Sequence, residues 1–320
     1  MKIDAKKIKL FSSIGSRATF GLTCLDLVKE NRENLVVLTS DVSTSAGLDR
    51  FRKMHGENFY DVGIAEQNLI GVASGLSHMG YNVLTTTFAP FQTMRCLEQI
   101  KVNAGYMRNK IIMVGLASGV ILNTLGFTHC CIEDISIIRS IPGITLLSPC
   151  DPSEVYKSVF AAHNHKNPVY IRLTGGSNVK PVYQDDYDFV IGEPNELVKG
   201  NKEIIISTGS IVSNCLEAVK QLKKPGLGLI NMHTLKPINE KKLFEMINDK
   251  EKIFSFEEHS EVGGLASIIR DIKEKYNLNF KLISTSLPDD YFPSGEYEDI
   301  LKRYKLDING IKETIIKNKL

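Results

Sequence analysis

A carboxylate at the start of a helical pattern is the feature of this sequence best placed to do chemistry. Glu66 stands in DVGIAEQNLIGVASGL, after a short strand-like stretch and at the first position of a predicted helix. Open α/β sheets bind ligands at the carboxyl ends of their strands, so a carboxylate here would face a binding crevice. An acid at this position is also favoured by the helix dipole alone, and both interpretations stay open.

Two aromatic residues follow one predicted strand later. Phe88 and Phe91 lie in TTTFAPFQTMR, with Pro90 where a helix would begin. Rings in a turn usually fill a core. A crevice with flat rings on one side and a carboxylate on the other also suits a protonatable heteroaromatic ligand, because the rings stack on it while the acid serves a ring nitrogen.

A histidine and an arginine complete the set of candidate residues. His129 lies in a glycine-containing loop, TLGFTHCC, ahead of an apolar helical segment that carries Glu133 and Asp134. Most loop histidines have no catalytic role. Arg172 ends the strand-like run PVYIRLT, where it could bind a phosphate or carboxylate, although a structural ion pair fits the pattern equally well.

The elements that must position these residues alternate along the whole chain. Short β-branched runs indicate buried parallel strands, and the stretches between them have helical periodicity. This alternation predicts an α/β fold with two doubly wound domains, each a mostly parallel sheet flanked by helices. The predicted strands begin at Asn34, Asn58, Val83, Lys110, Ile144, Pro168, Glu203, Gly226, Lys252 and Phe280, and the predicted helices span 17–30, 66–79, 91–105, 152–162, 212–222, 240–247 and 265–275.

A polar segment containing proline and glycine interrupts the alternation. With 320 residues the chain is long enough for two domains, each with its own core. We therefore predict a first domain over 1–178, a linker over 179–200 and a second domain over 201–320.

Composition excludes several classes of protein. Lys+Arg of 39 against Asp+Glu of 37 leaves a formal charge of +2, which does not favour a nucleic-acid partner. The N-terminal segment has no signal-peptide pattern and no apolar run reaches the length of a membrane span, so we expect no membrane partner and a cytoplasmic location. The six cysteines lack C-x-x-C spacing, which indicates reduced thiols rather than disulfides or a metal site in this chain.

Taken together and in order, the motifs resemble one family. The runs DVGIAEQNLIGVASGL, TFAPFQTMRCLEQI and GFTHCCIEDISIIRSIPGI, followed by SPCDPSEV, resemble the pyrimidine-binding domain of transketolases, and STGS and FEEHSEVGGLAS resemble the C-terminal domain of the same family. The resemblance covers nearly the whole chain. It implies a thiamine-diphosphate-dependent transferase that moves a two-carbon ketol or acyl unit to an aldehyde or ketone, with Mg²⁺ as the metal.

The resemblance also assigns roles to residues of the cofactor site. Glu66 matches the catalytic acid that hydrogen-bonds the cofactor's pyrimidine ring and drives it to its imino tautomer. Phe88 and Phe91 match the aromatic residues that line and stack on that ring, and Asp41 matches an acid close to it.

Substrate-binding roles follow in the same way. Arg17, Ser45 and Arg172 match positions that bind the substrate phosphate, and His129 matches a catalytic histidine that hydrogen-bonds the hydroxymethyl end of the donor. Two positions depart from the family pattern: Leu125 replaces an aspartate and Ala117 replaces a histidine. These departures imply an altered pocket and a small-molecule substrate other than an ordinary pentose phosphate.

The family's diphosphate-binding domain, with its Gly-Asp-Gly motif and metal-ligating asparagine, has no counterpart in this sequence. The resemblance therefore implies that a separate N-terminal transketolase subunit holds the diphosphate and metal, as in split transketolases, with a self-dimer inside an α2β2 assembly. Two alternatives remain at this stage: the beta subunit of a 2-oxo-acid dehydrogenase first component, and a non-catalytic scaffold subunit that keeps the fold.

Overall fold

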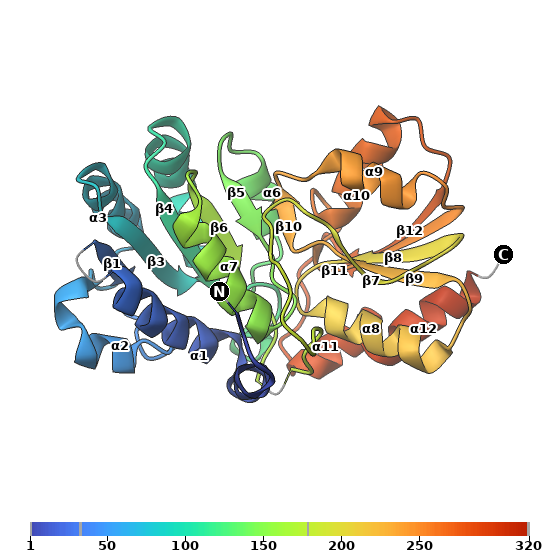
Figure 1. The fold of residues 1–320 in the computed structure, drawn as a ribbon, viewed down its shortest axis with the longest axis horizontal. Coiled ribbons are helices and arrows are strands. Elements are labelled where there is room, and N and C mark those ends of the chain that lie inside the picture. Colours follow the sequence, from blue (N-terminus) through green and yellow to red (C-terminus); the bar gives the residue numbers. More distant parts are fainter. Residues whose placement is uncertain (1, 32–33, 178, 319–320) are drawn as a thin grey trace.

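The computed structural model describes residues 2–31, 34–177 and 179–318, and it contains two sheets with helices on both faces of each (Figure 1). The predicted α/β class with two doubly wound, mostly parallel sheets is confirmed. Within the described ranges, none of the helices combines the length and the apolar character needed to cross a membrane.

The first sheet has seven strands in the order β10-β5-β6-β4-β3-β1-β2. All of them run parallel except β10, which is antiparallel to β5. Their bounds are β1 Leu35–Thr39, β2 Phe59–Asp61, β3 Asn82–Phe88, β4 Ile111–Leu116, β5 Thr145–Leu147, β6 Val169–Arg172 and β10 Thr234–Lys236.

Strand residues alternate between two hydrophobic cores, which is why both faces of this sheet carry helices. Val36 and Leu38 of β1 pack in the core that includes α3 (Glu66–His78), whereas Leu35 and Val37 pack in the core beneath α1 and α7. Helices α1 (Ala5–Asn31) and α7 (Pro152–Asn164) lie side by side on that second face (Figure 1).

The second sheet has the order β12-β11-β8-β9-β7, in which only the edge strand β7 is antiparallel. Helices α9 and α10 cover one face, and α8 and α12 cover the other (Figure 1). The bounds are β7 Asn195–Val198, β8 Glu203–Ser207, β9 Leu227–Asn231, β11 Lys252–Ser260 and β12 Lys281–Leu287, with α8 Ile211–Leu222, α9 Glu240–Ile247, α10 Leu265–Lys275, α11 Tyr297–Arg303 and α12 Ile308–Lys317.

The helix predicted over 91–105 is instead a chain of short pieces: α4 (Ala89–Gln92), a 3-10 turn, α5 (Leu97–Gln99) and a π-helix (Ile100–Tyr106). The first break falls at Thr93, whose hydroxyl donates to the carbonyl oxygen of Ala89 at 2.6 Å. A hydroxyl bonded to the preceding turn competes with the regular helical pattern.

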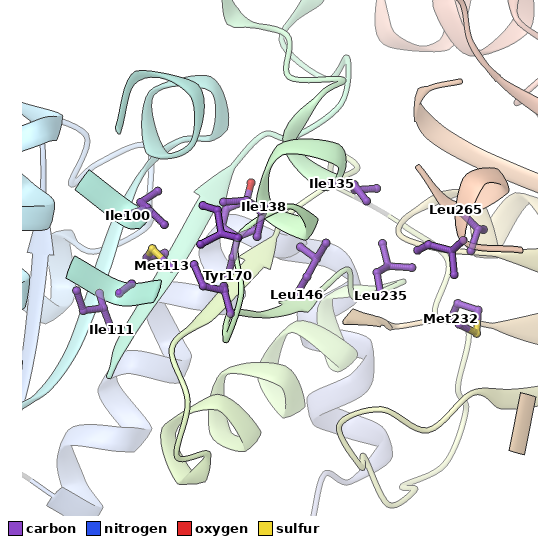
Figure 2. Close-up of a cluster of buried hydrophobic side chains, with 14 of the residues drawn as sticks. Ile100, Ile111, Met113, Ile135, Ile138, Leu146, Tyr170, Met232, Leu235 and Leu265 are labelled. Carbon is purple, nitrogen blue, oxygen red and sulfur yellow. The ribbon is translucent and has the colours of Figure 1, made fainter. Parts of the chain in front are cut away.

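The predicted boundary between the domains needs correction in two places. Residues 195–198 lie in the predicted linker but form β7, and β10 of the predicted second domain joins the first sheet. β7 is an edge strand with polar residues, so it lacks the apolar run that marks a buried strand. Figure 2 shows the core at this junction, where Leu146 and Tyr170 of the first sheet share one cluster with Met232, Leu235 and Leu265.

Candidate functional site

The candidate residues of the first domain gather at the carboxyl edge of the first sheet. Asp41 follows β1, Glu66 follows β2, Phe88 ends β3, Ala117 follows β4 and Arg172 ends β6. The strands that carry them are parallel, so all five positions lie at the same edge. This is the edge at which open α/β sheets form their binding crevices.

A hydrogen-bonded turn presents Glu66 at this edge. The Asp61 carboxylate accepts from the backbone N–H groups of Asp41 at 2.9 Å and Gly63 at 3.0 Å, and the Ser40 hydroxyl accepts from the N–H of Ala65 at 3.0 Å. Glu66 is the first residue of α3 and is only 5% exposed. The Asp41 side chain itself is exposed.

The carboxylate of Glu66 is paired with an arginine that no sequence pattern marks. Nη1 of Arg95 lies 2.8 Å from Oε2 of Glu66. The same guanidinium lies over the ring of Phe91, 4.0 Å from its centroid, and 43% of the Arg95 side chain is exposed. Arg95 thus contacts both an acid and an aromatic ring of the candidate site.

Three rings form a group next to this pair. The centroid of His129 lies 5.6 Å from that of Phe91 and 6.2 Å from that of Phe88, and the two phenylalanine centroids are 6.4 Å apart. All three contacts are edge-to-face, a favoured arrangement for aromatic pairs. Nδ1 of His129 is 3.1 Å from the Thr128 hydroxyl. The structure therefore brings His129 together with Phe88 and Phe91.

Arg17 and Ser45 belong to a second part of the same edge. Helix α1 is interrupted at Gly15 (φ 81°), so that Arg17 begins a new helical stretch and lines a small cavity of about 90 Å³ with Ala117, Gly175 and other residues. The turn that contains the half-buried Ser45 packs on this stretch. A Cβ atom at Gly47 would lie 2.9 Å from the carbonyl oxygen of Arg17, so the two backbones approach closely.

Arg172, one of the residues predicted to bind the substrate, lies in different surroundings from the prediction. Its side chain is completely buried, its Nε lies 2.9 and 3.0 Å from the two carboxylate oxygens of Asp134, and its Nη2 donates to the carbonyl oxygen of Glu258 at 2.6 Å. Burial alone would lower the pKa of Arg172, but Asp134 and Glu258 outweigh it and raise that pKa. The structural ion pair, which the sequence pattern leaves open as an alternative, is the arrangement present, and the side chain has no exposed surface.

The Arg172 pair belongs to a buried network that joins the two sheets. The Glu258 carboxylate accepts from the backbone N–H of Val120 at 2.7 Å and from the hydroxyls of Ser210 at 3.0 Å and Tyr297 at 2.8 Å. Burial raises the pKa of Glu258, although Arg172 and these donors oppose the rise. Since its donors come from both halves of the chain, this network fixes how the halves meet. Sequence reasoning missed Glu258 because nothing local marks its partners.

The two departures from the family pattern occupy different surroundings. Leu125 is 60% exposed, in the loop before His129. Ala117 is buried, has a left-handed backbone (φ 54°) and lines the cavity beside Arg17. Neither replacement brings a charged or hydrogen-bonding side chain to the edge of the sheet. In the described part of the chain, no three His, Cys, Asp or Glu side chains are grouped so as to hold a metal ion.

Two family models match the chain. Residues 13–178 match the pyrimidine-binding domain of transketolase, and residues 192–311 match the C-terminal domain of transketolase. The chain therefore belongs to the transketolase family and corresponds to its C-terminal half.

Individual relatives narrow this assignment. The chain is 32% identical over 306 residues to one subunit of the apulose-4-phosphate transketolase of Phocaeicola vulgatus, covering 95% of this chain and 97% of the relative. It is 33% identical over 307 residues to a putative transketolase C-terminal section of Methanocaldococcus jannaschii, covering 94% and 95%. A solved split-gene transketolase, described as an inactive beta4 tetramer, has a TM-score of 0.84 and 30% identity, covering 95% of this chain and 98% of that one. The relatives that match over nearly their whole length are thus named as a transketolase subunit, a transketolase C-terminal section and a split-gene transketolase.

Proposed function

We propose that this chain is the C-terminal subunit of a split, thiamine-diphosphate-dependent transketolase-like enzyme that transfers a two-carbon ketol or acyl unit to an aldehyde or ketone. The observation that carries the proposal is the position of Glu66, a nearly buried carboxylate at the carboxyl edge of the pyrimidine-binding domain. Relatives named as a transketolase subunit and as a putative transketolase C-terminal section, which the chain matches over 97% and 95% of their lengths, support it.

The residues around Glu66 fit the pyrimidine ring of the cofactor. A carboxylate with so little contact with water needs a hydrogen-bonding or cationic partner, and a protonatable ring nitrogen supplies one. The Arg95 guanidinium contacts both the Glu66 carboxylate and the Phe91 ring, so the flat face of this ring lies close to the carboxylate. Glu66 would hold a proton at the ring nitrogen, Phe88 and Phe91 would line the ring, and Asp41 would lie near it.

When bound, thiamine diphosphate supplies a nucleophilic carbon and an electron sink for breaking and forming carbon–carbon bonds. The part of this chain is to orient the cofactor and substrate and to move protons. His129, whose ring lies against Phe88 and Phe91, would donate to the donor's hydroxymethyl oxygen. Arg17 and Ser45 would hold a substrate phosphate beside the small cavity.

A separate N-terminal subunit would hold the diphosphate and Mg²⁺. The relatives named as a transketolase subunit or as a C-terminal section support this division, since each matches the present chain over nearly its entire length. The surface near the site also carries exposed apolar side chains, with Ile64 78% and Leu125 60% exposed. Such a surface is typical of an interface, and we propose a self-dimer within an α2β2 assembly.

The substrate would differ from an ordinary pentose phosphate. Leu125 and Ala117 cannot supply the charge and hydrogen bonds of the aspartate and histidine that they replace. A deoxy or modified sugar, a nucleotide-linked sugar or a pyruvate-like donor would fit the less polar pocket.

Reconstitution with the N-terminal subunit tests this proposal. The specificity constants for xylulose 5-phosphate with ribose 5-phosphate are compared with those for deoxy, modified, non-phosphorylated and 2-oxo-acid substrates. We expect an alternative substrate to be preferred, and the Leu125→Asp variant to shift the preference toward the pentose phosphates. If ordinary pentose phosphates alone were turned over with kcat/KM of about 10⁴ M⁻¹s⁻¹ or more, the proposal of an altered substrate pocket would be wrong. Reduction of lipoamide would instead indicate a 2-oxo-acid dehydrogenase component. The absence of turnover with every substrate would indicate a non-catalytic scaffold subunit.

A further inference from the structure

Arg95 occupies both groups that the proposed function reserves for the cofactor's pyrimidine ring. Its Nη1 lies 2.8 Å from Glu66 Oε2, and its guanidinium lies 4.0 Å from the centroid of Phe91. The backbone of Arg95 is held in place by Gln67, whose side-chain N–H donates to the Arg95 carbonyl oxygen at 3.2 Å. Gln67 is the neighbour of Glu66 on α3, so the loop and the helix are tied together at this point.

A guanidinium resembles a protonated heteroaromatic ring in the two properties that matter here. It is planar, so that it can lie flat on an aromatic face, and it donates N–H groups to a carboxylate in its own plane. From this overlap of contacts we propose that Arg95 is a placeholder. It satisfies Glu66 and covers Phe91 in the chain without cofactor, and it must move away when the pyrimidine ring binds. This inference rests on the proposed function, because it takes the pyrimidine to use Glu66 and Phe91.

The exposure of the two partners explains how such a placeholder can work. Glu66 is nearly buried, and a buried carboxylate without a partner is costly, so Arg95 keeps the empty site intact. The Arg95 side chain is 43% exposed, and its charged end can return to water at little cost. The contact is therefore strong enough to order the site and weak enough to be displaced.

Competition of this kind lowers the affinity for the cofactor. Cofactor binding has to break the Arg95 ion pair and its contact with Phe91, each of which changes an equilibrium by only a few-fold at an exposed position. In a free subunit Arg95 thus competes with the pyrimidine ring for Glu66 and Phe91, and the additional contacts of the diphosphate-binding partner make its displacement more favourable. Removing Arg95 should make binding tighter, which is the opposite of what loss of a cofactor-binding residue does.

The test is calorimetric titration of thiamine diphosphate with Mg²⁺ into the chain assembled with its N-terminal subunit. For Arg95→Met we expect a dissociation constant about 3- to 10-fold lower than that of the wild type, because the methionine keeps the apolar stem and cannot pair with Glu66. For Arg95→Lys we expect a decrease of about 2-fold, because the charge stays and the planar contact is lost. Arg52→Met, which removes an exposed arginine of α2 (Asp49–Met54), is the matched control and should leave binding unchanged.

The outcomes separate this inference from the function on which it rests. A dissociation constant that is unchanged or higher in Arg95→Met would overturn the placeholder, because Arg95 would then stay in the loaded site or bind the cofactor. Should Arg95→Met fail to fold, the Lys variant decides in the same way. If the wild-type assembly itself bound no thiamine diphosphate, the proposed function would fail, and the placeholder with it.

Discussion

Two arginine–carboxylate pairs at the same sheet edge have opposite surroundings. The Arg95–Glu66 pair joins a nearly buried carboxylate to a half-exposed guanidinium, whereas both members of the Arg172–Asp134 pair are completely buried. The buried guanidinium also donates to the carbonyl oxygen of Glu258 in the other half of the chain. Similar residue types therefore form a displaceable contact in one place and a fixed junction in the other.

Desolvation explains the difference. In the Arg95–Glu66 pair only the guanidinium is open to water, so Arg95 can leave at little cost to itself, whereas Glu66 needs another partner in its place. In the Arg172–Asp134 pair both charges are buried, and loss of one partner leaves an uncompensated charge in the interior. The half-exposed pair can thus take part in binding, while the buried pair only holds structure.

Removing the Glu66 carboxylate of the half-exposed pair should give the largest effect. This effect should fall on activity rather than on stability. In the reconstituted enzyme we expect Glu66→Gln to lower kcat by about 10²–10⁴-fold, as for loss of a general acid–base group. The free energy of unfolding should change by less than about 1 kcal/mol. Steady-state kinetics and urea unfolding measure the two quantities, with Glu98→Gln, an exposed glutamate on α5, as the control. Near-normal turnover would mean that Glu66 has no catalytic role and serves only as an acid at the start of a helix.

Breaking the buried Arg172–Asp134 pair should instead lower stability. We expect Arg172→Met to lower the free energy of unfolding by about 3–5 kcal/mol, because Asp134 is left buried without its cation. The same change at Arg52, whose partner Asp49 is exposed, should cost less than about 1 kcal/mol. Urea unfolding of both variants checks this. Equal losses would mean that burial does not distinguish the two kinds of pair.

Glu154 is a buried carboxylate without a cationic partner, so the free energy of unfolding should depend on pH through this group. Burial, together with Asp151, raises the pKa of Glu154 to about 7, although the carboxylate accepts from the N–H of Cys150 at 2.6 Å and from Asn231 at 3.0 Å. The folded pKa lies above the unfolded value near 4.5, so the folded state binds the proton more tightly. Stability is then greatest below pH 4.5 as far as this group is concerned, and it falls as the pH rises toward 7.

We expect this group to lower the free energy of unfolding by about 2–3 kcal/mol between pH 5 and pH 8. Glu154→Gln cannot ionise, so its unfolding free energy should fall less over the same range. The exposed Glu245→Gln on α9 serves as the control and should follow the wild type. Denaturant unfolding at several pH values gives the slopes, and identical slopes for Glu154→Gln and the wild type would contradict the assignment.

Much of the fold could be predicted from the sequence, because buried parallel strands are continuous apolar runs. The strands that begin near Val83 and Lys110 are examples. The edge strand β7 could not be predicted in this way, since it lacks an apolar run. Helix α12 carries Ile311 and Ile315 on one face and Asp307 at its N-cap, a helical pattern that the sequence analysis did not assign.

For the site, the sequence predicted that Glu66, Phe88 and Phe91 would lie around one crevice, because each follows a predicted parallel strand. It placed His129 only in a loop, and the family resemblance alone added it to the site. Their roles remain predictions. It could not predict the partners of the arginines, because Arg172 reaches Asp134 across 38 positions and no local pattern specifies such a contact. The sequence pattern therefore leaves Arg172 open between a bound anion and an ion pair, and only the family resemblance assigns it to the substrate. Neither gives a sign of the contacts of Arg95.

The most direct test of the divided cofactor site is calorimetry of thiamine diphosphate with Mg²⁺ on the isolated chain and on the chain assembled with its N-terminal subunit. We assign the pyrimidine contacts to this chain and the charged diphosphate and metal contacts, which should dominate affinity, to the partner. We therefore expect weak or undetectable binding to the isolated chain and micromolar or tighter binding to the assembly. Micromolar or tighter binding to the isolated chain would contradict the divided site.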